Sequence, residues 1–355
     1  MKKLKPGKYT KDNIITYGMI ILVYIIVQIL TGTGHISSLM QGLLVPLCVY
    51  VILAVSLNLT VGILGELSLG HAGFMCVGAF AGAFFSKCTQ DVITADLPRF
   101  VLAILLGAVS AGIIGFLIGM PVLRLRGDYL AIVTLAFGEI IKNIINVLYI
   151  GKDSRGLHFS LKDSLSLGLE EDGVVIINGA QGITGTPKNS TFTIGIILIV
   201  ITLIIVLNLI RSRDGRAIMS IRDNLIAAES IGINITKYKL MAFSISAALA
   251  GIAGVLYSHN LNSLMATPKN FGYNMSIMIL VFVVLGGIGN IRGSIIAAVV
   301  LTLLPELLRG LSDYRMLIYS VILIVMMLFN WSPKLIYLRE KYSSKRLFKK
   351  NREVR

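Results

Sequence analysis

The sequence predicts an all-α, polytopic membrane protein with about ten transmembrane or partly re-entrant helices. Three observations support this fold class. Hydrophobic residues make up 55% of the 355 residues and charged residues only 14%, whereas soluble domains contain about a quarter charged residues. The mean hydropathy is +0.82. The apolar residues also gather in long uninterrupted runs, which a lipid bilayer requires and a soluble core does not.

Ten apolar stretches are long enough, or nearly long enough, to cross a bilayer as a helix. They are residues 14–30, 43–61, 67–85, 100–122, 129–149, 191–209, 240–257, 273–285, 294–308 and 316–329. The third, eighth and ninth are short or interrupted by glycine. We expect these three to be broken or re-entrant segments whose backbone is shielded by protein or lines a cavity. Together the stretches define a membrane domain over residues 14–331.

Small residues recur at the spacing that lets helices approach closely. Gly78 and Gly82 form a GxxxG pattern, as do Gly115 and Gly119. The stretch 240–257 carries a row of Ser, Ala and Gly along one side. Lipid tails give apolar helices no reason to prefer a protein neighbour, so we expect close backbone packing at these positions to hold the helices together.

Basic residues predict which side of the membrane each loop occupies, because Lys and Arg near the ends of spans resist translocation. The net charge is +15. We expect the N-terminal residues 1–13, the loop 210–239 and the tail 332–355, all rich in basic residues, to be cytoplasmic. The segment 150–190, with four basic and five acidic residues, is then external. Both termini are predicted to lie on the cytoplasmic side of the inner (cytoplasmic) membrane.

Several kinds of chemistry have no support in the sequence. There is no GxxxxGK[ST] phosphate loop, no CxxC pair and no nucleophile beside a recognisable base. Basic residues do not alternate with aromatic ones as in nucleic-acid interfaces, so we expect no nucleic-acid partner. Cys48, Cys76 and Cys88 lie in or beside apolar runs and are expected to be inert. The sequence predicts a non-catalytic chain with no cofactor or metal of its own.

One stretch breaks the apolar pattern, "RDGRAIMSIRDNLIAAESIGINITKYK" at residues 213–239. On a helix of 3.6 residues per turn, Ile218, Ile221 and Leu225 share one face, and the opposite face is mostly polar. We expect a single short amphipathic helix at the membrane surface. It is either a connector whose apolar side lies among lipid headgroups or a helix that docks a soluble partner.

The ends of this amphipathic helix have recognisable signals. Asp214 is placed to cap its start, and Gly232 can end it in the left-handed conformation. Asn234 can cap the helix that re-enters the membrane. We therefore expect a surface helix over residues 214–232 that is hinged to the next span.

This stretch resembles a known family. The segment "AAESIG", residues 227–232, has the A-A-x-x-x-G core of the cytoplasmic coupling loop of ABC importer permeases, although Ile226 stands where many of them carry glutamate. The surrounding "GRAIMSIRDNLIAAESIGIN" is similar to the loop of the M-type (LivM) permeases of branched-chain amino acid importers. That family implies the ABC importer permease fold.

Four other stretches resemble the same family, in the same order along the chain. They are "LNLTVGILGELSLGHAGFMCVGAF" (57–80), "LRLRGDYLAIVTLAFGEI" (123–140), "NGAQGITGTP" (178–187) and "VLGGIGNIRGSIIAAVVLTLLPELLR" (284–309). The resemblance covers residues 43 to 309. The chain departs from it at Ser294, where the family usually has proline, and at Arg292, where a neutral or aromatic residue is more common.

The resemblance implies a function and partners. Such a chain is one permease of an ATP-driven importer for branched-chain amino acids, paired with an H-type permease, two ABC ATPase subunits and an extracytoplasmic substrate-binding protein, with ATP held by the ATPases. The coupling loop fits a groove on the ATPase. In this sequence, the resemblance assigns the coupling role to Gly215, Arg216, Arg222, Asp223, Ala227, Ala228 and Gly232.

Polar residues and glycines within the apolar runs are candidates for the translocation path. They are Glu66, Ser68, Gly70, Gly73, Glu139, Gly286, Gly287 and Gly289. Glu139 falls near the middle of a predicted span, where an unpaired carboxylate is costly, and Lys142 lies one turn further on. We weigh three roles for Glu139: a structural ion pair with Lys142, a polar lining to the path, and a proton relay.

The substrate stays open, and so do two functions of other classes. Permeases of the same type also carry urea, short amides and other amino acids, so the substrate is the least determined part of the prediction. A secondary transporter driven by protons or sodium would need intramembrane acids, of which Glu139 is the central one. A structural or signalling membrane protein would need no ATPase partner.

Overall fold

The computed structural model describes residues 8–33, 37–90, 92–125, 127–169, 173–308 and 314–331. The basic tail 332–355 and the first seven residues of the basic N-terminus, both predicted to be cytoplasmic, lie outside the described residues.

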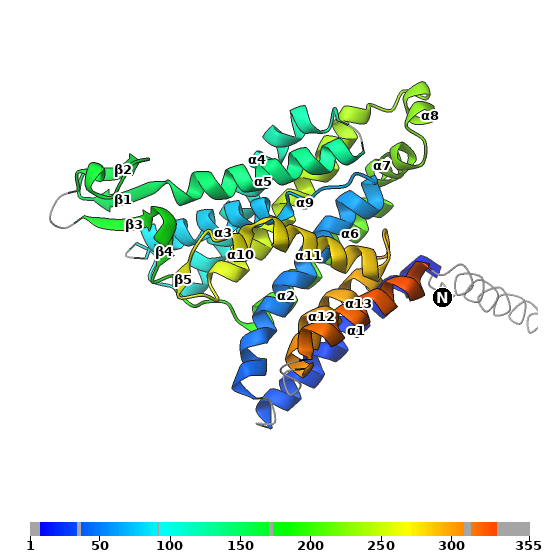
Figure 1. Cartoon of the computed structure of the whole chain (residues 1–355), viewed down its shortest axis with the longest axis horizontal. Coiled ribbons are helices and arrows are strands. Elements are labelled where there is room, and N and C mark those ends of the chain that lie inside the picture. Colours follow the sequence, from blue (N-terminus) through cyan, green and yellow to red (C-terminus); the bar gives the residue numbers. More distant parts are fainter. Residues whose placement is uncertain are drawn as a thin grey trace, which may run out of the picture.

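The described chain is mostly helical (Figure 1). Its longer helices are α1 (Lys8–Gly32), α2 (Ser38–Asn58), α3 (His71–Cys88), α4 (Asp96–Val122), α5 (Asp128–Asn146), α6 (Phe192–Arg211), α7 (Arg213–Asp223), α9 (Ile235–Ser258), α11 (Tyr273–Gly286), α12 (Ile291–Leu307) and α13 (Arg315–Trp331). Short helical pieces are η1 (Leu59–Leu64), η2 (Leu165–Leu167), η3 (Gly179–Gln181), α8 (Leu225–Ser230) and α10 (Pro268–Phe271). The strands are β1 (Tyr149–Asp153), β2 (Gly156–Ser160), β3 (Val174–Asn178), β4 (Ile183–Thr184) and β5 (Ser263–Leu264).

The helices agree with the predicted polytopic fold. Each of the ten predicted stretches contains a helix. Within the described residues, five helical segments are long and apolar enough to cross a membrane, namely Ser38–Leu64, Asp96–Val122, Phe192–Arg211, Ile235–Ser258 and Pro268–Gly286. The stretch predicted over 67–85 is interrupted as expected, because residues 65–70 are not helical and α3 begins only at His71.

Close packing of α3, α4 and α9 forms the centre of the structure. A Cβ atom on Gly78 would collide with the backbone of Gly251, and one on Gly251 would meet Gly107. Gly115 lies against Ala247 in the same way. The predicted small-residue packing is thus confirmed, since these helices meet where at least one of them lacks a side chain.

Helix α2 is almost entirely enclosed. Over α2 and η1 together, 94% of the 18 most apolar consecutive residues are buried. Helices α6, α9, α11 and α12 surround this segment. The C-terminal half of α2 also carries buried polar groups, and Asn58 is fully buried. These groups lie next to η1, a π-helix that breaks the regular hydrogen bonding of the span just before residues 65–70.

One part of the fold departs from the all-α prediction. The segment predicted as an external loop folds into a three-stranded antiparallel sheet with strand order β2-β1-β3. A second antiparallel pair joins β4 to β5, the latter from the chain after α9. Figure 1 shows the sheet at one end of the molecule and α7 and α8 at the other. We call these the sheet end and the loop end.

Candidate functional site

The loop predicted to be a single amphipathic helix is in fact two helices. α7 ends at Asp223, and Asn224 adopts an extended conformation (φ −157°, ψ 105°) before α8 begins at Leu225. The Asn224 side chain accepts a hydrogen bond from the backbone N–H of Ala227 (3.0 Å), which caps α8. The continuous helix over 214–232 was therefore a wrong prediction, because Asn224 breaks and restarts it.

The first cap was also assigned to the wrong residue. The hydroxyl of Ser212, not the carboxylate of Asp214, accepts from the backbone N–H of Gly215 at 3.0 Å. Ser212 stands directly between α6 and α7, so it is the residue with cap geometry. Gly215 has to be small at this turn, because a Cβ there would collide with the carbonyl of Leu209.

The end signals of the loop are confirmed. Gly232 has a φ of +85°, the left-handed conformation that favours glycine. The Asn234 side chain accepts from the backbone N–H of Lys237 (3.1 Å) and caps α9. The polypeptide therefore turns sharply from α8 into the long helix α9, and the loop is anchored at both ends by spans.

Apolar side chains are exposed on α8 and on the residue that follows it, but not on α7. Ile218 and Ile221 are buried against the body of the protein, whereas Ile226 and Ile231 are 75% and 76% exposed. Among the residues predicted to contact an ATPase, Ala228 is buried within the chain, whereas Ala227 is exposed. The surface available to another protein is thus the outer side of α8 and its flanks.

Arg222 connects α7 to the second span. Its Nη1 donates to the carbonyl of Gly62 in η1 (2.9 Å), while Asp223 holds the other side of the guanidinium (Nη2 to Oδ1, 2.9 Å). The aliphatic part of Arg222 packs on Gly65, whose φ is +81°. The Gly62 carbonyl can accept here because it lies in the last turn of η1, where carbonyls have no partner within the helix. Two of the predicted coupling residues, Arg222 and Asp223, are therefore placed at the broken part of the span.

A second link between this loop region and the break is the ion pair of Lys239 and Glu66. Lys239 lies in the first turns of α9, and Glu66 follows the left-handed Gly65. Only 5% of the Lys239 side chain and 15% of the Glu66 side chain are exposed. Glu66 was predicted to lie at the break, but its ion-pair partner could not be predicted, because Lys239 is 173 residues away in the sequence.

The turn between α11 and α12 packs against the same break. Gly287 and Gly289 both have positive φ values, +94° and +81°. The backbone N–H of Gly289 donates to Oδ1 of Asn58 (2.9 Å), and a Cβ on Gly62 would collide with that backbone. Gly286 sits where a Cβ would meet Gly293. Three predicted path glycines thus form a tight turn at the loop end.

The two departures from the family pattern, Ser294 and Arg292, both have hydrogen-bond partners on other helices. Asn58 donates through Nδ2 to the hydroxyl of Ser294 (2.8 Å). The Nε of Arg292 donates to the hydroxyl of Thr16 in α1 (2.8 Å). Ser294 also keeps its backbone N–H bond to Asn290 (3.1 Å), which a proline could not make.

The remaining path candidates lie between α3, α5 and α11. Gly70 and Gly73 allow α3 to pack directly on the backbone of α5, at Thr134 and Gly138. The hydroxyl of Ser68 is buried and has no hydrogen-bond partner among the residues that the structure describes.

The expected ion pair of Glu139 with Lys142 is present. The second oxygen of Glu139 accepts from the backbone N–H of Tyr273 at the start of α11 (2.8 Å). The carboxylate therefore ties α5 to the first turn of α11, where backbone N–H groups lack helical partners.

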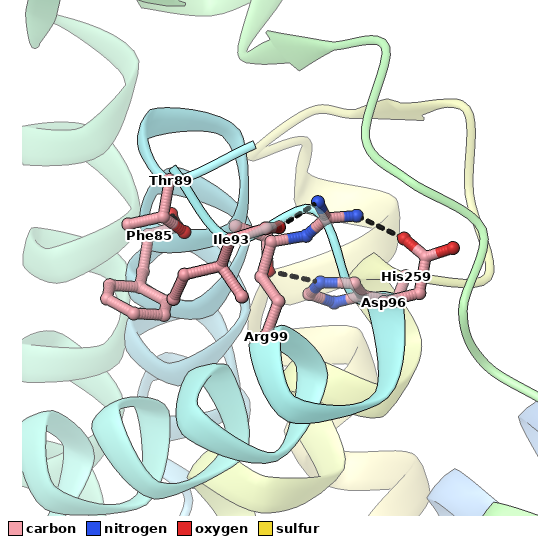
Figure 2. Close-up of polar contacts among 7 residues, drawn as sticks. Phe85, Thr89, Ile93, Asp96, Arg99 and His259 are labelled. Atoms are coloured by element: carbon pink, nitrogen blue, oxygen red, sulfur yellow. Dashed lines mark hydrogen bonds and ion pairs between the residues drawn. The ribbon is translucent and has the colours of Figure 1, made fainter. Parts of the chain in front are cut away.

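At the sheet end, a buried arginine holds the connection between α3 and α4 (Figure 2). Nη1 of Arg99 donates to the carbonyl of Ile93 (2.9 Å), and Nη2 forms an ion pair with Asp96. Next to it, Nε2 of His259 bonds with the hydroxyl of Ser86 (2.8 Å). This group could not be predicted from the sequence, because its members come from segments far apart in the chain, near the ends of α3, α4 and α9.

On the sheet, Asp153 closes the β1–β2 turn. Burial alone would raise the pKa of its carboxyl, but hydrogen bonds from the backbone N–H groups of Arg155 and Gly156, together with His158, lower the pKa below its ordinary value. The carboxylate is therefore the form that holds the turn.

These features define a polytopic helical membrane protein in which a two-helix loop is joined to a broken span. The chain belongs to the family described as the permease component of branched-chain amino acid transport systems, whose model matches residues 39–330.

Named relatives agree with this family. The chain is 37% identical over 296 residues to the high-affinity branched-chain amino acid transport system permease protein LivM of Salmonella typhimurium, which covers 81% of this chain and 67% of that protein. It is 34% identical over 313 residues to the LivM protein of Escherichia coli, covering 85% and 69%. The LivH permease of Salmonella typhimurium is 24% identical over 288 residues, covering 79% and 88%. No solved structure matches the chain.

Proposed function

We propose that this chain is the non-catalytic M-type permease of an ATP-driven importer that carries branched-chain amino acids into the cell. The LivM relatives are branched-chain amino acid transport permeases by name, which supports the substrate class. An H-type permease is the expected partner in the membrane, and the similarity to the LivH protein supports this. ATP hydrolysis belongs to two separate ATPase subunits, and an extracytoplasmic binding protein delivers the substrate.

The coupling loop, α7 and α8 with residues 224 and 231–234, is the surface on which an ATPase docks. This proposal makes the loop end cytoplasmic and the sheet end external, with both termini cytoplasmic. The side chains of Ile226 and Ile231 suit docking, because exposed isoleucines on a charged loop gain by burial against a partner.

The observation that carries the proposal is the bond from Arg222 to the carbonyl of Gly62. Through it, a displacement of α7 acts directly on the span that loses regular helix at η1 and residues 65–70. The Lys239–Glu66 pair adds a second connection from α9 to the same break. We infer that ATPase motion opens the translocation path by moving this break, with Glu66, Ser68 and the 286–289 turn beside it.

The test replaces Ile226 and Ile231 by aspartate in one chain that is expressed with its partner subunits. We expect this double variant to reach the membrane but to lose at least tenfold of ATPase co-purification and of ATP-dependent leucine uptake. Leu165→Asp is the matched control, because Leu165 is 89% exposed at the sheet end and should tolerate the charge. Full ATPase binding by the double variant would contradict the docking role.

A further inference from the structure

A basic cavity opens beside the coupling loop, between α1, α6, α7 and the start of α12. Its volume is about 720 Å³. Among the described residues that line it, Arg211, Arg216 and Arg292 are basic and none is acidic. Ile63 and Leu207 contribute to the apolar part of the wall. The charge of the cavity therefore favours an anionic ligand.

The arginines are held at the rim by contacts within the protein. Nη1 of Arg216 donates to the carbonyl of Arg211 (3.1 Å), and Nε of Arg292 donates to Thr16. The first turn of α12 begins at the same place, because Asn290 both lines the cavity and caps this helix. The positive end of the helix dipole and three planar guanidinium groups suit a phosphate oxygen cluster.

A narrow apolar groove lies deeper along the same helices. Its volume is about 130 Å³, and every residue that lines it is apolar. Met19, Ile20 and Val23 follow Thr16 on α1, and Val299 follows Arg292 on α12 by about two turns, or ~10 Å. Figure 1 shows α1 and α12 along the same side of the molecule. On both α1 and α12, the groove therefore begins about one turn beyond the basic cavity.

We propose that the cavity and groove bind one anionic glycerophospholipid, with its phosphate among Arg211, Arg216 and Arg292 and one acyl chain in the groove. A free phosphate or a nucleotide would use the rim but leave the apolar groove without an occupant. The assignment to the cytoplasmic leaflet rests on the orientation given under the proposed function, whereas the chemistry of the site does not depend on it. Basic pockets between helices on this side of a membrane are suited to anionic headgroups.

The test measures lipid retention by the full chain, purified in a neutral detergent, by native mass spectrometry. Phosphatidylglycerol and phosphatidylcholine with identical acyl chains are titrated separately. We expect phosphatidylglycerol to bind about tenfold more tightly or better. The double variant Arg211→Gln/Arg292→Gln should abolish that preference. The control Arg213→Gln/Lys237→Gln removes two exposed charges of the same loop that do not line the cavity, and it should retain the preference.

A second variant tests the groove independently. Val300→Trp fills the groove from a position that is 38% exposed, so the fold should tolerate it. It should weaken phosphatidylglycerol binding several-fold at an unchanged melting temperature. Equal binding of the two lipids by the wild-type chain would overturn the proposal, and so would a preference that survives the arginine double variant. Displacement of the lipid by millimolar inorganic phosphate would instead identify a site for a free anion. Because no ATPase is present, failure of ATPase docking would leave these results unaffected.

Discussion

Charged residues within the helical bundle are held by specific partners. Lys239 pairs with Glu66, and Lys142 pairs with a Glu139 that also accepts a backbone N–H. Removing one partner of a buried ion pair lowers the stability more than replacing both partners, because the remaining charge is left without compensation. The cost should therefore depend on which partner is the more deeply buried.

This reasoning predicts an asymmetry for the Glu66–Lys239 pair. Glu66→Gln leaves the more enclosed lysine unpaired and should lower the stability by about 2–4 kcal/mol, whereas Lys239→Met leaves a carboxylate that is 15% exposed and should cost less. The double variant should recover part of the loss. Thermal unfolding of the purified chain in detergent measures this order, with the exposed Lys237→Met as the control. A larger loss for Lys239→Met would contradict the assignment.

A pH dependence is expected at the β1–β2 turn. Because the folded pKa of Asp153 lies below its unfolded value, its contribution is present above about pH 4 and disappears as the pH falls through the lowered folded pKa. Hydrogen exchange of residues 149–160 should show constant protection from pH 7 to 5 and a loss only below about pH 4. Asp153→Asn should remove the acid-dependent step. Loss of protection already near pH 6 would show that the Asp153 carboxylate does not control this turn.

At the scale of helices, close glycine contacts determine where the spans cross. Gly78 has no room for a Cβ against the backbone of Gly251. Gly112, on α4, is different, because a Cβ there would lie 3.3 Å from the Cβ of Ala248. The same substitution should therefore have different consequences at these two glycines.

We predict that Gly78→Ala lowers the stability by about 1–3 kcal/mol, the usual cost of overpacking, because backbone cannot move aside as a side chain does. Gly112→Ala should be neutral within about 0.5 kcal/mol, since its nearest contact, at 3.3 Å, needs only a slight shift of the two helices. Melting temperatures of the two variants in the same detergent provide the comparison. Equal melting temperatures would show that α3 and α9 are less tightly packed than described.

The ends of the helices show which features could be predicted from the sequence and which could not. Gly232 and Asn234 were predicted correctly, because their roles depend only on local backbone geometry. The break at Asn224 was missed, although an asparagine three residues before Ala227 is a cap signal that the amphipathic pattern concealed. Ser212 and Asp214 are both ordinary cap residues, and only the turn from α6 decides between them.

At the scale of the whole molecule, contacts between distant segments could not be predicted. The apolar runs predicted the spans, and glycine spacing predicted close packing. However, Arg222 and Gly62 are 160 residues apart, and no local pattern joins them. The sheet was missed because its strands are short and contain charged residues and glycine. A single sequence indicates which residues are unusual, but the fold decides which of them meet.

The central claim is that the coupling loop lies on the cytoplasmic side and is covered by another protein. Single cysteines at Ile226 and Leu165, each introduced into a Cys88→Ser background because Cys88 is partly exposed, test it with a membrane-impermeant maleimide. The native Cys48 and Cys76 give little background because they are buried. In intact cells that produce the complete importer, the account predicts labelling of Leu165→Cys but not of Ile226→Cys. After permeabilisation, Ile226→Cys should react rapidly only when the ATPase subunits are absent. Labelling of Ile226→Cys in intact cells would contradict the account.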